Sequence, residues 1–159
     1  MKKIAIFVDV QNIYYTTRDT YGRPFNYRSL WKEIAKQGEI VCAKAYAINK
    51  GDDQQIKFQD ALKHIGFEVR LKPYIQRRDG SAKGDWDVGI AIDVMEAAAR
   101  EDIDTIILLS GDGDFDLLLE KVRQAYGVHT EVYGVLKLTA GSLIEAADEF
   151  HPIRPELLM

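Results

Sequence analysis

The stretch IAIFVD, residues 4–9, places five consecutive apolar residues directly ahead of an aspartate. A continuous apolar run with β-branched residues is typical of a parallel strand that is buried on both faces. Further along the chain, similar short apolar runs alternate with longer amphipathic stretches. This alternation indicates βαβ units, so we expect an α/β fold with a mainly parallel central sheet.

The remaining elements follow the same rhythm. Apolar runs predict further strands over residues 39–48, 67–71, 104–109 and 128–135. Helical spacing and capping residues predict helices over residues 29–36, 52–65, 87–100, 114–125 and 138–147. The segment KPYIQRRDGSAKG, residues 72–84, combines proline, glycine and basic residues, so we expect an exposed loop there.

Length and charge narrow the classes of protein. A chain of 159 residues predicts one domain over residues 1–159, because single cores commonly hold about 100 to 200 residues. A net charge of −4 argues against a simple basic DNA-coating protein but does not exclude a metal-dependent nuclease. No signal peptide and no apolar run of about 20 residues is visible, so we expect a cytoplasmic protein without a membrane partner. The oligomeric state stays open, with a homo-oligomer as one alternative.

Acidic side chains follow two of the predicted strands. Asp9 ends the first strand, and Asp112 and Asp114 follow the strand that ends at residue 109. In a doubly wound sheet, ligands bind at the carboxyl ends of the strands where the strand order reverses, so these acids should share one crevice. Crowded carboxylates are costly without a cation, and oxygen ligands suit Mg²⁺ or Mn²⁺ better than zinc.

Polar neighbours extend this predicted site. The Asn12 amide could orient a carboxylate or hold a water molecule, and Gly111 and Gly113 around Asp112 would let the backbone bend sharply and approach a ligand closely. A simpler alternative is that Ser110 and Asp112 only cap the following helix. Capping explains one acid of this segment but not the separate Asp9.

A third group of acids lies in KGDWDVGIAID, residues 83–93. Asp87 is expected either to bind the metal or a water molecule, or to favour the helix start through the helix dipole. Asp93 lies about 120° from Asp87 around the helix axis, so both cannot face one small site equally. Asp93 is therefore expected either to support a metal ligand from behind or to be a solvated residue, and Asp116 and Ser110 are further candidates for such a supporting role.

One basic and aromatic stretch stands out in this acidic chain. Single-stranded nucleic acid is held by such a combination of phosphate contacts and base stacking, although a solvated loop is an equal alternative. The RNA-binding candidates are Lys72, Tyr74, Arg77, Arg78, Lys83 and Trp86. Tyr14 and Tyr15 could stack bases or pack in the core. The three histidines, His64, His129 and His151, lie far apart in sequence and show no zinc-binding spacing.

The ordered motifs resemble a known family. The motifs are FVDVQN at 7–12, KGDWDVGIAID at 83–93, SGDGDF at 110–115 and ADEFHPI at 147–153. Together they resemble the NYN domains of the PIN-like nuclease superfamily, in particular the LabA-like group. The resemblance implies a PIN-like, Rossmann-like three-layer α/β/α sandwich and divalent-metal-dependent RNA cleavage.

The resemblance also implies roles for individual residues. By motif, Asp9 and Asn12 match the Asp-x-x-Asn of the first strand, Asp87 matches the acid after Lys-Gly, and Asp112 and Asp114 match the SGDxD pair. Asp93 matches a recurring acid whose role the motif does not fix, and Asp116 departs from the group's usual pattern.

We therefore expect a ribonuclease that uses Mg²⁺ or Mn²⁺. Two alternatives are a metal phosphotransferase, which usually needs a second Asp where Gln11 stands, and a non-catalytic or regulatory module that binds RNA or protein.

Overall fold

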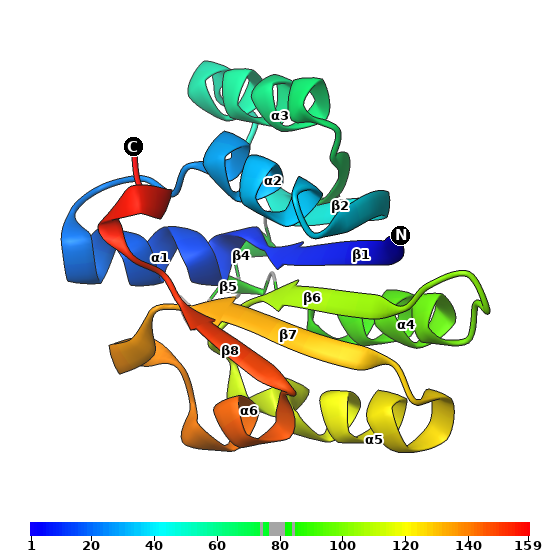
Figure 1. Ribbon diagram of the computed structural model, residues 1–159. Helices are drawn as coiled ribbons and strands as arrows, with labels where there is room; N and C mark the ends of the chain where they lie inside the picture. The colour runs from blue at the N-terminus through cyan, green and yellow to red at the C-terminus, as the bar shows by residue number, and fades with distance from the viewer. Residues whose placement is uncertain (74, 77–81, 84) are drawn as a thin grey trace.

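The central sheet of the computed structural model has six strands, all paired in parallel, in the order β3-β2-β1-β6-β7-β8 (Figure 1). The structure describes residues 1–73, 75–76, 82–83 and 85–159. The strands are β1 (Lys2–Asp9), β2 (Gly38–Asn49), β3 (Glu68–Pro73), β6 (Thr105–Leu109), β7 (His129–Gly134) and β8 (Glu149–Pro152). The α/β class and the parallel sheet expected from the sequence are confirmed.

Helices cover both faces of this sheet, which gives three layers. Alternate residues of β1 point to opposite faces: Ile4, Ile6 and Val8 enter one core, and Ala5 and Phe7 enter the other. The first core lies under α1 (Val10–Tyr21), α2 (Tyr27–Ala35) and α3 (Asp53–Ile65). The second lies under α4 (Asp87–Ala98), α5 (Asp116–Tyr126) and α6 (Gly141–Ala146). No helix among the described residues combines the length and apolarity needed to cross a bilayer.

The strand order reverses between β1 and β6. The chain runs outward from β1 to β2 and β3, then returns through α4 to β6 on the other side of β1, and continues to β7 and β8. Val8 of β1 pairs with Leu109 of β6, so the residues that follow both strands leave the same edge of the sheet. The predicted switch point between the strands ending at Asp9 and Leu109 is confirmed.

Several elements differ from the sequence expectation. Helix α1 was not predicted, because its sequence VQNIYYTTRDTY mixes polar and aromatic residues without a clear apolar stripe. Strand β8 was also missed, so the sheet has one strand more than expected. The expected loop over 72–84 is wrong in part: β3 continues to Pro73, and β4 (Ile75–Gln76) pairs antiparallel with β5 (Ala82–Lys83).

Two helix starts also differ. The predicted helix over 114–125 begins as a short 3-10 turn, η1 (Gly113–Phe115), before α5. The predicted helix over 138–147 is split into η2 (Leu136–Leu138) and α6. The chain ends with η3 (Pro155–Leu157), which packs beside α2.

Candidate metal centre

Asp9 lies at the last position of β1 and also caps helix α1. Its Oδ1 accepts a hydrogen bond from the Asn12 backbone N–H at 3.3 Å, which begins the helix immediately after the strand. Its Oδ2 accepts the Ser110 hydroxyl at 3.2 Å. The carboxylate of Asp9 is therefore fixed by its own helix and by the end of β6.

The segment after β6 is organised by the same residues. Ser110 Oγ accepts a hydrogen bond from the Asp112 N–H at 3.1 Å, and Asp112 Oδ1 accepts one from the Asp114 N–H at 2.9 Å. The Asn12 side-chain oxygen accepts the Gly111 N–H at 2.8 Å. Asp112 thus caps η1, as the simpler sequence interpretation proposed, while its carboxylate also stays next to Asp9. The structure places Asn12 and Ser110 between α1 and this segment.

The glycine expectation needs a correction. Gly111 does not adopt a left-handed conformation, and the close approach it permits is to the protein itself. A Cβ on Gly111 would lie 2.5 Å from the Leu138 carbonyl oxygen. Glycine is required here because the segment after β6 packs directly on the backbone that leads to α6.

Three carboxylates converge in front of this segment. One oxygen from each of Asp87, Asp112 and Asp114 lies within 4.8 Å of the others, a spacing that a single metal ion could span. Asp87 starts α4, whereas Asp112 caps η1 and Asp114 lies within it, so two elements contribute to the cluster: α4 and η1. The structure brings Asp87, Asp112 and Asp114 together and places Asp9 behind them through Ser110.

The pKa values of Asp9 and Asp87 are both raised, mainly because the two carboxyl groups are buried and also because other acids lie near them. Burial raises the pKa of Asp9 to about 6, with the charges of Asp112 and Asp85 adding to the effect. Burial, a hydrogen bond with Asp112 and the charges of Asp112, Asp85 and Asp9 raise the pKa of Asp87 to about 7. A carboxyl with a raised pKa inside an acidic cluster is an arrangement that a bound cation stabilises.

Asp85 was not singled out from the sequence. It is exposed, accepts a hydrogen bond from the Asp87 N–H at 3.3 Å, and contributes negative charge to both Asp9 and Asp87. Its only sequence signal is its position two residues before Asp87 in the KGDWD motif.

Trp86 lies between these two acids in the sequence, and contacts with the protein already occupy part of its indole ring. Its indole N–H donates to the Ala47 carbonyl at 2.8 Å, and its ring packs against Tyr46. Lys72 Nζ lies 4.5 Å from the ring centroid and donates to the Asp85 carbonyl at 3.2 Å. The structure thus places Trp86 and Lys72 as a support under the backbone of Asp85.

Asp93 and Asp116, two of the predicted supporting residues, lie away from the acid cluster. Asp93 is buried, and its Oδ2 accepts hydrogen bonds from Tyr46 at 2.7 Å and from Arg70 at 2.8 Å. Asp93 is therefore not a solvated residue, and its partners are structural. Asp116 turns its carboxylate to the N–H of Leu117 at the start of α5. Among the described residues, Ser110 is hydrogen-bonded to the acids of the site, whereas Asp93 and Asp116 are not.

The predicted RNA-binding stretch is only partly visible. Tyr74, Arg77 and Arg78 lie outside the described residues, and the side chain of Lys83 is not among those described. Tyr14 and Tyr15 are exposed by 50% and 38%, so neither is a core residue.

The donor set fits a hard divalent cation. All the converging ligand atoms are carboxylate oxygens, and Mg²⁺ and Mn²⁺ prefer such ligands, whereas zinc sites usually include nitrogen or sulfur. At least two acids have pKa values near or below neutrality and can therefore lose their protons to a metal at physiological pH.

Comparisons with known proteins identify similar chains. A family model described as NYN domain matches residues 3–154. The curated Low amplitude and bright protein LabA from Synechococcus elongatus is 31% identical over 156 residues, which covers 93% of this chain and 82% of LabA.

Solved structures agree on the fold. A protein of unknown function from Vibrio parahaemolyticus superimposes with a TM-score of 0.93 at 53% identity, covering 99% of this chain and 96% of that one. A carbohydrate kinase from Agrobacterium tumefaciens superimposes with a TM-score of 0.51 at 14% identity. The match covers 94% of this chain and 60% of the kinase chain, and it shows a shared fold alone.

Proposed function

The chain belongs to the NYN domain family, within its LabA-like group, and from this premise we propose that it hydrolyses RNA phosphodiesters with a divalent metal ion. The observation that carries the proposal is the convergence of Asp87, Asp112 and Asp114 within 4.8 Å, next to Asp9. The ion is Mg²⁺ or Mn²⁺, which Asp112 would hold together with Asp87 and Asp114, and Asp9 would complete the ligand set from behind. When bound, such an ion would lower the pKa of a water molecule, and a second ion, recruited with the substrate, would stabilise the leaving 3′ oxygen.

The protein side chains would orient the attacking water, position the acids and neutralise the phosphate. Asp87 or Asp114 orients the attacking water, and a carboxylate with a pKa of about 7 is matched to accepting its proton near neutral pH. Ser110 and Asn12 are positioning residues, since they fix Asp9 and the backbone of Gly111. No protein nucleophile is required, and attack by water with a 3′ leaving oxygen gives a product with a 5′ phosphate. Lys83 or Arg78 would neutralise the scissile phosphate.

A groove between α1 and the start of α3 is the proposed path of the RNA, and its described lining includes none of the four acids. It has a volume of about 720 Å³, and Val10 and Gln11, the residues directly after Asp9, form part of its lining. Tyr14 and Tyr15 line it as well, and the guanidinium carbon of Arg18 lies 5.4 and 4.8 Å from their ring centroids. Aromatic faces beside a cation bind unpaired bases and phosphates, which favours single-stranded RNA as the substrate.

A cleavage assay with a fluorescent RNA tests the proposal. Cleavage should require Mn²⁺ or Mg²⁺, stop with chelator, and be lost in Asp9→Asn. The matched control is Asp60→Asn, which makes the same chemical change at an exposed position on α3. If Asp9→Asn cuts RNA as fast as the unmodified chain at equal metal concentration, the assignment is wrong. Metal and RNA binding without any cleavage would instead favour the non-catalytic module.

A further inference from the structure

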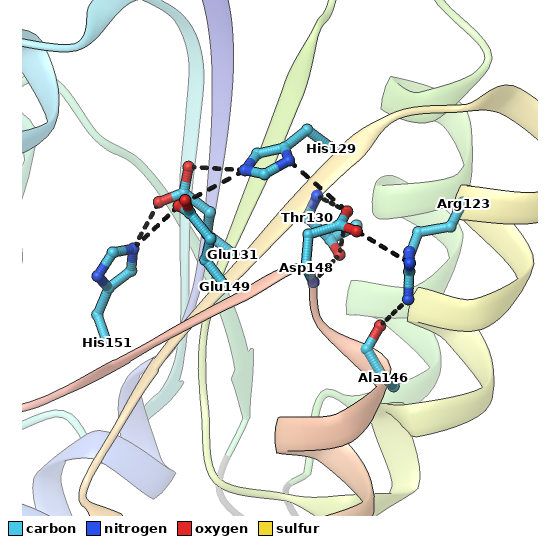
Figure 2. Close-up of polar contacts among 8 residues, drawn as sticks. All are labelled: Arg123, His129, Thr130, Glu131, Ala146, Asp148, Glu149 and His151. Carbon is cyan, nitrogen blue, oxygen red and sulfur yellow. Dashed lines mark hydrogen bonds and ion pairs between the residues drawn. The ribbon is translucent and has the colours of Figure 1, made fainter.

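A second cluster of metal-ligating side chains lies on β7 and on the edge strand β8. His129 and Glu131 come from β7, and Glu149 and His151 come from β8. Figure 2 shows the two imidazoles on opposite sides of the two carboxylates. We propose that His129, Glu131 and Glu149 bind a divalent transition-metal ion such as Zn²⁺, which clamps the edge strand β8 to β7.

The strand register places two like charges face to face. Glu131 and Glu149 are paired residues of the parallel β7 and β8 strands. Like charges directly opposite each other destabilise a strand pair unless a cation lies between them. The imidazoles or a metal ion would therefore stabilise this pair.

Glu131 is the residue that points to a ligand. Its side chain is only 1% exposed, and its Oε1 is bonded to His151 Nε2 at 2.7 Å. The other oxygen, Oε2, is buried and has no hydrogen-bond partner among the described residues. It lies 3.3 Å from His129 Nε2, without the alignment of a hydrogen bond. A buried carboxylate oxygen without a hydrogen bond is costly, and a metal ion would satisfy it.

The spacing of the donor atoms fits a tetrahedral ion. His129 Nε2 lies 3.3 Å from Glu131 Oε2 and 3.6 Å from Glu149 Oε2, and one atom from each of the three residues lies within 4.8 Å of the others. A tetrahedral zinc ion with bonds of about 2.0–2.1 Å has ligand atoms about 3.3–3.4 Å apart. Small side-chain movements would close the site, and water would complete the coordination.

Other side chains hold the proposed ligands from outside the site. Asp148 Oδ2 lies 3.7 Å from His129 Nδ1, and His151 is hydrogen-bonded to Oε1 of Glu131. Asp148 is itself fixed by Thr130 and by Arg123 at 3.0 Å (Figure 2). In a ligating histidine, the N–H of the other ring nitrogen usually donates a hydrogen bond to a carboxylate, and this partner fixes the ring orientation.

The proposed ion differs from the one expected at the aspartate cluster. Imidazole nitrogen with carboxylate suits zinc and related metals, whereas Mg²⁺ prefers oxygen alone. The two sites lie at different levels along the strands: His129 pairs with Thr105 and Glu131 with Ile107, whereas Ser110 follows the end of β6. Three to five residues of strand separate these levels, about 10–16 Å. The side chains of His129 and Glu149 are 37% and 52% exposed, which leaves a path for the ion.

The rival explanation is a metal-free ion-pair network. A protonated His151 would pair with Glu131 and Glu149, and Lys2 and Glu33 also act on these groups electrostatically. That network neutralises the carboxylates through His151, but it leaves Oε2 of Glu131 without a hydrogen bond. It also predicts that added metal has no effect on β8.

Zinc binding by the full chain decides between these alternatives. Zn²⁺ should be titrated by calorimetry into the Asp112→Asn variant, so that the aspartate cluster does not contribute. We expect one Zn²⁺ per chain and slower hydrogen exchange at the β8 amides after it binds. Glu149→Gln and His129→Gln should each weaken Zn²⁺ binding by at least about tenfold, because each removes a ligand. Both side chains are partly exposed, so both variants should fold.

The matched control is Glu120→Gln, on the exposed face of α5. It should bind Zn²⁺ like the Asp112→Asn parent. Absence of Zn²⁺ binding in that parent, or binding that neither ligand variant weakens, would overturn the proposal and leave the ion-pair network. Neither result bears on RNA cleavage, which the Asp9→Asn assay tests separately.

Discussion

The Ser110 hydroxyl donates a hydrogen bond to Oδ2 of Asp9 at 3.2 Å, joining two residues that are 101 positions apart in the sequence. The same oxygen of Ser110 accepts the N–H of Asp112. One fully buried hydroxyl therefore sets the position of two acids from two neighbouring strands at the point where the strand order reverses.

Ser110→Ala should reduce cleavage without unfolding the chain. The variant leaves the Asp112 N–H without its acceptor and frees one Asp9 oxygen, a loss of about 1–3 kcal/mol in the free energy of unfolding. Because the Ser110 hydrogen bond lowers the pKa of Asp9, its loss should raise that pKa further. The acidic limb of the pH–rate profile in Mn²⁺ should then move to higher pH.

The control for this variant is Ser142→Ala, an exposed hydroxyl on α6. A Ser110→Ala chain with an unchanged pH profile, but with reduced thermal stability, would mean that Ser110 is structural and does not position Asp9.

Metal-free stability should depend on pH through Asp9 and Asp87. Their folded pKa values, about 6 and about 7, lie above the ordinary value of 3.8. The folded chain thus holds these protons more tightly than the unfolded chain, so their contribution is greatest below about pH 4 and is lost as the pH rises through 6 and 7. Thermal unfolding in chelator should show Tm falling over this range.

Metal should reverse that loss at pH 8. A ligand at 100 times its Kd stabilises the folded state by about 2.7 kcal/mol, and Mn²⁺ should raise Tm accordingly. Asp9→Asn should be more stable than the unmodified chain in chelator at pH 8, and should gain less from Mn²⁺. Equal pH dependence in both chains would contradict the role of Asp9.

The sequence predicted those parts of the site that short motifs carry. The apolar run Ile4–Val8 and the aspartate after it identified the central strand and the end of it that carries Asp9, because a buried parallel strand has a strong local signature. Asp112 and Asp114 were found in the same way after β6. Asp93 was harder, since the helical angle separated it from Asp87 but could not show that Tyr46 and Arg70 bury it.

The residues that were missed depend on strand register. Glu131 and Glu149 lie 18 positions apart, and only the pairing of β7 with β8 makes them neighbours. His129 and His151 were judged by their sequence spacing, which lacked a zinc motif. Strand β8 itself, EFHP, is four residues long with a mixed apolar pattern, so periodicity gave no signal for it.

Gly89→Ala should displace the acids of the site by moving the Trp86 side chain. A Cβ at this position in α4 would lie 2.6 Å from Cε3 of Trp86, so the indole must shift away from Ala47 and Tyr46. Overpacking of this kind costs about 1–3 kcal/mol, and the shift would move Asp85 and Asp87 on either side of the ring. Weaker Mn²⁺ binding by calorimetry is expected. Gly141→Ala, where a Cβ meets nothing within 4 Å, should bind Mn²⁺ normally.

Asp93→Asn should lower stability while leaving cleavage by the folded chain unchanged. The substitution removes the charge that pairs with Arg70 at 2.8 Å and Lys44 at 3.8 Å, and weakens the bond from Tyr46. Because Arg70 is partly exposed, we expect a loss of only about 1–3 kcal/mol, measured by denaturant unfolding. A large fall in the cleavage rate of fully folded protein would instead return Asp93 to the metal centre.

Tyr14→Ala should weaken binding of single-stranded RNA and spare the chemical step. Tyr14 is half exposed in the groove beside Asp9, and stacking one base on an aromatic ring contributes about 1–3 kcal/mol, equivalent to about 5- to 150-fold in Kd. The acids are untouched, so KM should rise while kcat stays the same. Tyr126→Ala on α5 removes an equally exposed ring away from the groove and should change neither constant. A rise in KM that is the same for both variants would place the RNA elsewhere, whereas a selective rise for Tyr14→Ala would connect the groove to the metal centre.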